Sequence, residues 1–270
     1  INLPNADWIR AAHGSKSITI GNLTQAYSIA AEGSGFKEAF VDDAEMRKLM
    51  TKYESQCDDL HTDLHECLGH GSGQLLPGVL PDALKAYGNT IEEARADLFG
   101  LYYMADAKMV ELGLLENAEA YKAQYYSYML NGLMTQLRRI TPGHHLEEAH
   151  MRNRALIAHW VLEHAEGAVE LVQHEGKTWL HINDYEALRA LFAQLLAEVQ
   201  RIKSEGDLVA AKALVERYAV KVDAHLLNEV HERYASLHIA PYKGFINPVL
   251  EPVYGKGSER KVIVDIKVTY

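Results

Sequence analysis

"HTDLHECLGHGSGQ", residues 61–74, is the most informative stretch of this sequence. A helix that carries a zinc-binding histidine pair usually reads H-E-x-x-H, because histidines four residues apart lie on one helical face. Here the inserted Gly69 places His65 and His70 five residues apart. Five residues rotate an ideal helix by about 500°, so a regular helix would leave the two side chains roughly 140° apart.

A local helix distortion would restore the pair. One extra residue in a helical turn is a π-bulge, which is frequent at functional sites, and glycine tolerates unusual backbone conformations best. We therefore predict a distorted helix near Gly69 that brings His65 and His70 to one face. Glu66, next to the first histidine, could then reach a metal-bound water. The alternative is two ordinary histidines on the surface of a helix.

A third metal ligand is expected on a neighbouring element, because a catalytic zinc needs three protein ligands and an open position. "IEEARADLFGLYY", residues 91–103, offers Glu92, Glu93 and Asp97 on a helix for which Thr90 is the expected N-cap. Glu93 and Asp97 share a face, so at most one of the adjacent glutamates is a direct ligand. The other carboxylates can hold the histidines through their free ring nitrogens. The alternative is a solvated helix start whose glutamates complement the helix dipole.

The rest of the chain predicts a mainly α fold. Apolar residues recur at three- and four-residue spacing from about residue 37 to 240. One β-hairpin is expected around Glu175-Gly176-Lys177, and "KSITIG" near the start is strand-like. After Pro241, "NPVLEPV" and "KVIVDIKVTY" are expected to form a few terminal strands.

Composition limits the class of protein. The chain has 270 residues, 48% of them hydrophobic and 24% charged, as is usual for soluble globular proteins. A net charge of −10 disfavours nucleic acid or an anionic membrane as the main partner, and no stretch approaches the ~18 apolar residues of a membrane span. Two cysteines outside any C-x-x-C pattern indicate a reducing, cytoplasmic location. Because the chain begins at Ile1, we expect a fragment or a processed chain.

The order H-E-x-x-G-H, then E-E-x-x-A and an acid, resembles the dipeptidyl peptidase III family of zinc exopeptidases. "HECLGHGSG" matches the family through its glycines, and "EEAHMRNR" resembles a third family segment. "NLPN" near the start and "YKGFINP" near the end resemble two more. These pieces span almost the whole chain in the family's order.

The resemblance implies roles for particular positions. His65, His70 and Glu93 match the three ligands of a single zinc ion. Glu66 matches the glutamate that activates the zinc-bound water, and His150 matches a histidine that stabilises the transition state. The remaining matches are carboxylates that support the ligand histidines, Glu92, Asp97 and Asp82, and residues that bind the substrate, Asn2, Asn5, Arg154 and Lys243.

The resemblance also implies an activity, the release of dipeptides from the amino terminus of short peptides. Family members have a second, partly β-barrel lobe, so this chain would be a fragment that lacks much of that lobe and has low activity alone. Residues 1–36 would belong to or border the second lobe, residues 37–240 would form the helical zinc-binding catalytic lobe, and residues 241–270 would reach the second lobe. The alternatives are a zinc endopeptidase and a non-catalytic zinc-binding module, although a structural zinc site seldom keeps an open position beside a glutamate.

Overall fold

The computed structural model describes residues 33–237 without interruption, together with isolated positions and short strands in the two terminal segments. Asn5 and Lys243, two of the expected substrate-binding residues, lie outside the described residues, as does the side chain of Asn2. Within the described part of the chain, no helix combines the length and apolar character that crossing a membrane requires.

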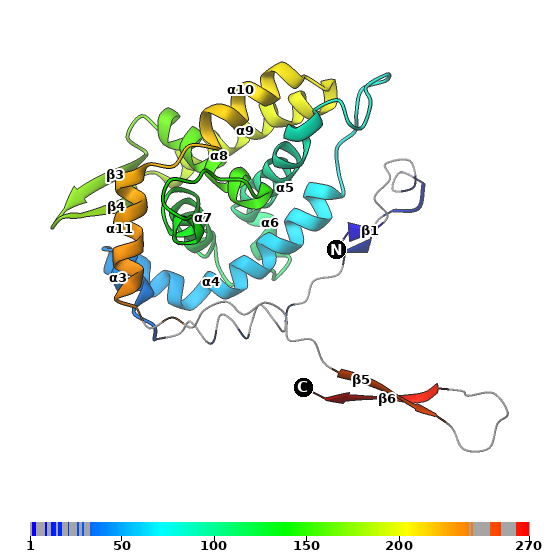
Figure 1. The fold of residues 1–270 in the computed structure, drawn as a ribbon, viewed down its shortest axis with the longest axis horizontal. Coiled ribbons are helices and arrows are strands. Elements are labelled where there is room, and N and C mark those ends of the chain that lie inside the picture. Colours follow the sequence, from blue (N-terminus) through cyan, green and yellow to red (C-terminus); the bar gives the residue numbers. More distant parts are fainter. Residues whose placement is uncertain are drawn as a thin grey trace.

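Helices dominate the described region (Figure 1), as the apolar periodicity predicted. The mainly α fold class is therefore confirmed. The α-helices are α3 (Phe36–Phe40), α4 (Ala44–Leu64), α5 (Gly88–Met104), α6 (Ala107–Glu111), α7 (Tyr121–Leu133), α8 (Ala149–His164), α9 (Tyr185–Glu205), α10 (Leu208–Tyr218) and α11 (Ala224–Ala235). A π-helix, η1 (His65–His70), continues α4, and the short 3-10 helices are η2 (Lys85–Tyr87) and η3 (Thr135–Arg139).

The strands form separate antiparallel pairs. The expected hairpin is present as β3 (Val169–His174) and β4 (Lys177–Ile182), which are joined at Glu175 and Gly176. The expected terminal strands are β5 (Val249–Tyr254) and β6 (Ile263–Thr269), which pair with each other. Two short strands, β1 (Asn2–Leu3) and β2 (Lys16–Ser17), pair near the amino terminus.

Helix α5 lies inside the helical bundle, where it packs against α4, α8, α9 and the π-helix. Apolar residues on several of its faces are fully buried, among them Ile91, Leu98 and Leu101, which is the pattern of a helix covered on all sides. Gly100 lets α4 approach closely, because a Cβ there would overlap the ring of His61. The bundle thus holds the end of α4 firmly against α5.

Helix α4 delivers the histidine motif to the bundle. Its N-cap is Asp43, whose side chain accepts hydrogen bonds from the backbone N–H groups of Glu45 and Met46. From there a buried stripe faces the core at the spacing of one helical face, and its members are Met46, Met50, Tyr53, Cys57, Leu60 and Leu64. The stripe ends at the residue directly before His65.

The start of α5 differs from the prediction. The helix begins at Gly88, after the 3-10 helix η2, so Thr90 lies buried inside it and is not the N-cap. The 3-10 helix leads directly into α5, and no side chain caps its N-terminus. Glu92 and Glu93 therefore lie beyond the first turn, and the interpretation of the two glutamates as partners of a helix dipole is wrong.

Candidate metal centre

The histidine motif forms a π-helix over His65–His70, as predicted from the inserted glycine. The wider turn brings the two histidines together, with their Nε2 atoms 3.0 Å apart and their rings nearly perpendicular. The regular helix that would have separated them is excluded.

Gly69 is required for a reason that the sequence did not show. A Cβ at this buried position would lie 2.6 Å from both the Cα and the Cβ of Ala96 on α5. Gly69 is not among the described glycines with a positive φ. The glycine therefore serves the close approach of the π-helix to α5, and a special backbone conformation is not what selects it.

Glu93 reaches the histidine pair from α5. Its Oε2 atom lies 3.3 Å from Nε2 of His65 and 3.7 Å from Nε2 of His70. The same oxygen is buried and accepts no hydrogen bond. The three ligand atoms lie within 4.8 Å of one another, so they form a candidate metal site.

The donor set fits a zinc ion. Nδ1 of His65 donates to Asp97 and Nδ1 of His70 donates to Glu92, which leaves both Nε2 lone pairs directed at the same point. Zinc bonds of about 2.0–2.1 Å in a tetrahedron place ligand atoms about 3.3 Å apart. The separations of 3.0, 3.3 and 3.7 Å bracket that value. Three protein ligands would leave the fourth position open, as in catalytic zinc sites.

Asp97 holds His65 in this orientation. Its Oδ1 lies 2.6 Å from Nδ1 of His65, and its Oδ2 accepts hydrogen bonds from Tyr128 on α7, at 2.7 Å, and from Asn153 on α8, at 2.8 Å. Burial alone would raise the pKa of Asp97, but the bond to His65 and the neighbouring positive charges hold it well below its usual range. Asp97 is therefore an ionised carboxylate, and its hydrogen bonds connect α5 with the π-helix, α7 and α8 beside His65.

Glu92 and Arg95 hold His70. Oε1 of Glu92 lies 2.8 Å from Nδ1 of His70. The fully buried guanidinium of Arg95 donates to both oxygens of Glu92, at 2.8 and 3.0 Å, and to the carbonyl oxygen of Gly69 at 2.7 Å. Lys203 on α9 also contacts Glu92. One arginine thus fixes both the partner of His70 and the backbone of the π-helix.

The carboxylates change how the two histidines titrate. Burial lowers the pKa of each histidine, but hydrogen bonds and charge outweigh burial. The contacts with Asp97 and Glu93 raise the pKa of His65 to about 10. The contacts with Glu92 and Glu93 raise the pKa of His70 to about 9. In the metal-free protein the pair therefore holds protons to higher pH than ordinary histidines do, and a metal ion that binds there has to displace protons from it.

His150 and Arg154 lie beside the site on α8. Nδ1 of His150 lies 3.3 Å from Oε2 of Glu93, and about half of its side chain is exposed. Arg154, one turn further on, is partly buried and close enough for its charge to lower the pKa of Asp97. Glu66 is a partly buried residue of the π-helix.

Asp82 is not brought to the cluster. It is exposed in the turn region before α5, and the Nδ1 atoms of both ligand histidines are bonded to other carboxylates. Its expected support of a ligand histidine is therefore wrong, because the helical partners Glu92 and Asp97 fill that position.

Sequence reasoning also missed several residues that support the site. Arg95 lies inside the glutamate segment, and its position in a strongly buried helix was the available signal for a paired charge. Asn153 lies between the singled-out His150 and Arg154. Tyr128 and Lys203 carried no signal, because only tertiary packing brings α7 and α9 to the metal ligands.

Comparisons with known proteins assign the chain to a family. The family model described as Peptidase family M49 matches residues 1–83 and 80–246. Dipeptidyl peptidase 3 of Mus musculus and that of Homo sapiens are each 28% identical to the chain over 266 residues, which are 83% of this chain and 35% of the relative. The chain thus spans about a third of the length of these curated relatives.

Solved structures show the same fold. DPP III from Caldithrix abyssi matches with a TM-score of 0.65 and 26% identity over 88% of this chain and 43% of that one. Dipeptidyl-peptidase III from Corallococcus sp. strain EGB matches with a TM-score of 0.66 and 21% identity over 88% and 41%. A histidine pair on a distorted helix, joined by a glutamate from the next helix, defines a candidate centre of the metallopeptidase class. The chain belongs to peptidase family M49, and the resemblance to dipeptidyl peptidase III is confirmed.

Proposed function

We propose that this chain is the zinc-bearing part of a dipeptidyl peptidase that releases dipeptides from the amino terminus of short peptides. The observation that carries the proposal is the convergence of His65, His70 and Glu93 on one point, with both Nδ1 atoms bonded to carboxylates. Family membership supports the reaction class, because the relatives are named dipeptidyl peptidase 3.

We assign the reaction to the following residues. His65, His70 and Glu93 hold one zinc ion, which when bound lowers the pKa of a water and polarises the scissile carbonyl. Glu66 accepts the proton of the attacking water and passes it to the leaving amine. His150 donates a hydrogen bond to the oxygen on which negative charge develops.

Substrate binding is assigned to Arg154 on α8 and to three residues of the terminal segments, Asn2, Asn5 and Lys243. Exopeptidase specificity also requires groups that bind the free amino terminus and stop longer peptides from sliding through. Because the chain spans about a third of its relatives, we infer that much of this binding surface belongs to a second lobe.

We propose that the chain itself divides into three parts relative to that second lobe. Residues 1–36 belong to or border the second lobe, residues 37–240 form the catalytic zinc lobe and residues 241–270 reach the second lobe. The isolated chain then binds zinc well and hydrolyses peptides slowly, and its expected location is the cytoplasm.

Incubation with an unstructured decapeptide tests the proposed reaction. Mass spectrometry after long incubation at high protein concentration is expected to find dipeptides removed stepwise from a free amino terminus and none from an acetylated one. Internal fragments would indicate a zinc endopeptidase. If dipeptide release does not exceed that of Glu66→Ala, the chain is a non-catalytic zinc-binding module and the proposed activity is wrong.

A further inference from the structure

A second group of potential metal ligands lies at the hairpin β3–β4. His174 ends β3 and His181 lies in β4, and both face Asp42, which belongs to the segment between α3 and α4. The Oδ2 atom of Asp42 lies 2.9 Å from Nε2 of His174 and 2.8 Å from Nε2 of His181. All three ligand atoms lie within 4.8 Å of one another.

The register of the hairpin places the two histidines together. His181 is opposite Glu170, and His174 is opposite Lys177, so the two histidines stand on the same face of the two-stranded sheet. Trp179, between them on that face, stacks on His174 with ring centroids 5.3 Å apart. The backbone pairing therefore places both histidines on one face, and the stacked indole also fixes the imidazole of His174.

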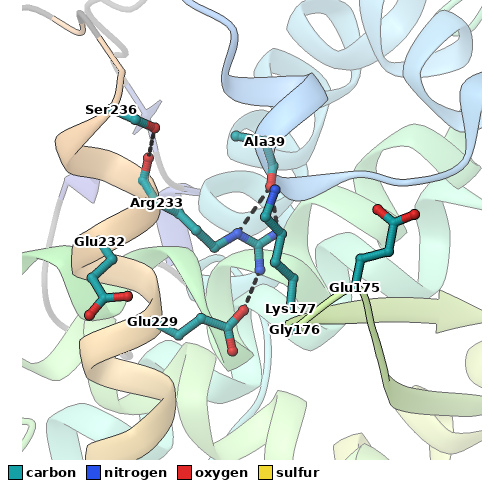
Figure 2. A pocket seen from close by; sticks show the side chains of 8 residues that line it. All are labelled: Ala39, Glu175, Gly176, Lys177, Glu229, Glu232, Arg233 and Ser236. Carbon is teal, nitrogen blue, oxygen red and sulfur yellow. Dashed lines mark hydrogen bonds and ion pairs between the residues drawn. The ribbon is translucent and has the colours of Figure 1, made fainter.

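The hairpin is also tied to the segment that carries Asp42. Arg233 of α11 donates to the carbonyl oxygen of Thr178 in β4, at 2.7 Å. Figure 2 shows that it also donates to the carbonyl oxygen of Ala39, at 3.1 Å. Glu229 holds the same guanidinium at 2.6 Å. Arg233 is almost fully buried and also lies over the ring of Trp179. Because Ala39 is three residues before Asp42, this bridge fixes the distance between the carboxylate and the two histidines.

The cluster keeps unused capacity to bind a cation. Asp42 accepts from both histidines on one oxygen, while its other oxygen, Oδ1, is buried and accepts no hydrogen bond. The carboxylate is mostly covered, with 17% exposure, whereas His174 and His181 are 46% and 38% exposed, so an ion can enter from solvent. Two imidazoles and one carboxylate suit divalent transition metals such as zinc.

We propose that Asp42, His174 and His181 form a second site for a divalent transition metal ion, with solvent completing its coordination. Tetrahedral zinc places ligand atoms about 3.3 Å apart, so each partly exposed imidazole has to move about 0.4 Å away from the carboxylate. Since the ring nitrogens must lose their protons to bind the ion, zinc replaces two hydrogen bonds with two metal bonds.

This site is separate from the candidate metal centre. Asp42 precedes α4 and His65 directly follows it, so the two sites lie at opposite ends of a helix of 21 residues, roughly 30 Å long. Figure 1 shows the hairpin β3–β4 beside α3 and α11, on the side of the bundle away from the carboxyl end of α4. The second site therefore does not depend on the proposed peptidase activity.

Zinc stoichiometry at a buffered micromolar free zinc concentration tests the proposal. The purified chain is expected to hold two zinc ions, measured by mass spectrometry of the metal after equilibrium dialysis. His174→Ala/His181→Ala and, separately, Asp42→Asn are expected to hold one. His225→Ala, which removes an exposed histidine elsewhere, should still hold two, and His70→Ala should hold one at the hairpin. One ion in the unaltered chain together with none in His70→Ala, or two ions in the hairpin variants, would overturn the proposal.

A second measurement does not depend on the folding of any variant. Crystals of the unaltered chain equilibrated with zinc are expected to show an anomalous peak within bonding distance of Nε2 of both His174 and His181. The absence of that peak in a crystal whose His65 site is occupied would reject the second site.

Discussion

The guanidinium of Arg95 donates a hydrogen bond of 2.7 Å to the carbonyl oxygen of Gly69, so a residue of α5 directly supports the π-helix. The same guanidinium holds Glu92, the partner of His70. The buried Arg95 therefore supports both the π-helix and the orientation of His70.

The close contact between Gly69 and Ala96 gives the first prediction. Gly69→Ala places a Cβ 2.6 Å from backbone and Cβ atoms of Ala96, so the π-helix has to move away from α5. We expect a loss of about 1–3 kcal/mol in the free energy of unfolding and a loss of bound zinc, measured by urea denaturation and metal analysis. Gly88→Ala is the control, because its Cβ meets nothing nearer than 3.7 Å. Equal stability and zinc content in both variants would contradict this role of Gly69.

Asp97 sets the tautomer of His65. In Asp97→Asn, the donors of Tyr128 and Asn153 require the amide oxygen, so the amide NH₂ faces Nδ1 of His65. Nδ1 must then accept, which moves the proton to the metal-binding nitrogen. We expect zinc affinity to fall about 10- to 100-fold, measured by competition with a chromophoric chelator. Exposed Asp82→Asn should leave the affinity unchanged, and a matching fall there would show that the effect is only one of net charge.

Glu66 is assigned to proton transfer and not to metal binding. Glu66→Ala is therefore expected to lower peptide turnover by at least ~100-fold while zinc content stays the same. Dipeptide release and metal analysis on the same preparation measure both. The control is Asp63→Asn, which changes an exposed acid of α4. Turnover by Glu66→Ala at the rate of the unaltered chain would remove this residue from the mechanism.

The titration of the histidines predicts a pH dependence of stability for the metal-free chain. The pKa values of about 10 for His65 and about 9 for His70 lie above the ordinary value of 6.5, so both groups stabilise the fold fully below pH 6.5. That stability is lost as the pH rises from 6.5 through 9 to 10. Urea midpoints in the presence of a chelator are expected to fall over this range.

Two controls test whether His65 and His70 cause this fall in stability with rising pH. The double variant His65→Asn/His70→Asn should lose most of the pH dependence of the urea midpoint. Saturating zinc should also reduce that dependence, because metal-bound histidines are already deprotonated. A slope that persists in the double variant would assign the titration to other groups.

Much of the fold followed from local sequence patterns. Helical periodicity predicted the bundle, and the turn at Glu175–Lys177 predicted the hairpin, because both signals are carried by neighbouring residues. The extra residue before His70 predicted the π-helix by geometry alone. The predicted start of α5 was wrong, because a 3-10 helix precedes Gly88 and such a helix leaves little trace in a sequence.

The surroundings of the candidate metal centre were only partly predictable. Spacing indicated that His65 and His70 could meet and that one of the adjacent glutamates could join them. The family resemblance selected Glu93 as that ligand, with Glu92 and Asp97 as its supports, and the structure brings these residues together. The hydrogen bonds of Tyr128 and Asn153 depend on how α7 and α8 pack against α5, which no local pattern encodes. The expected role of Asp82 was wrong, because Glu92 and Asp97 of α5 already hold both histidines.

Metal analysis of the purified chain tests the central claim most directly. After a wash with a weak chelator, which removes ions from exposed ligands, the unaltered chain is expected to retain one zinc ion per chain, and His70→Ala none. Retention of one zinc ion by His70→Ala under the same wash, or of none by the unaltered chain, would contradict a zinc centre at His65, His70 and Glu93.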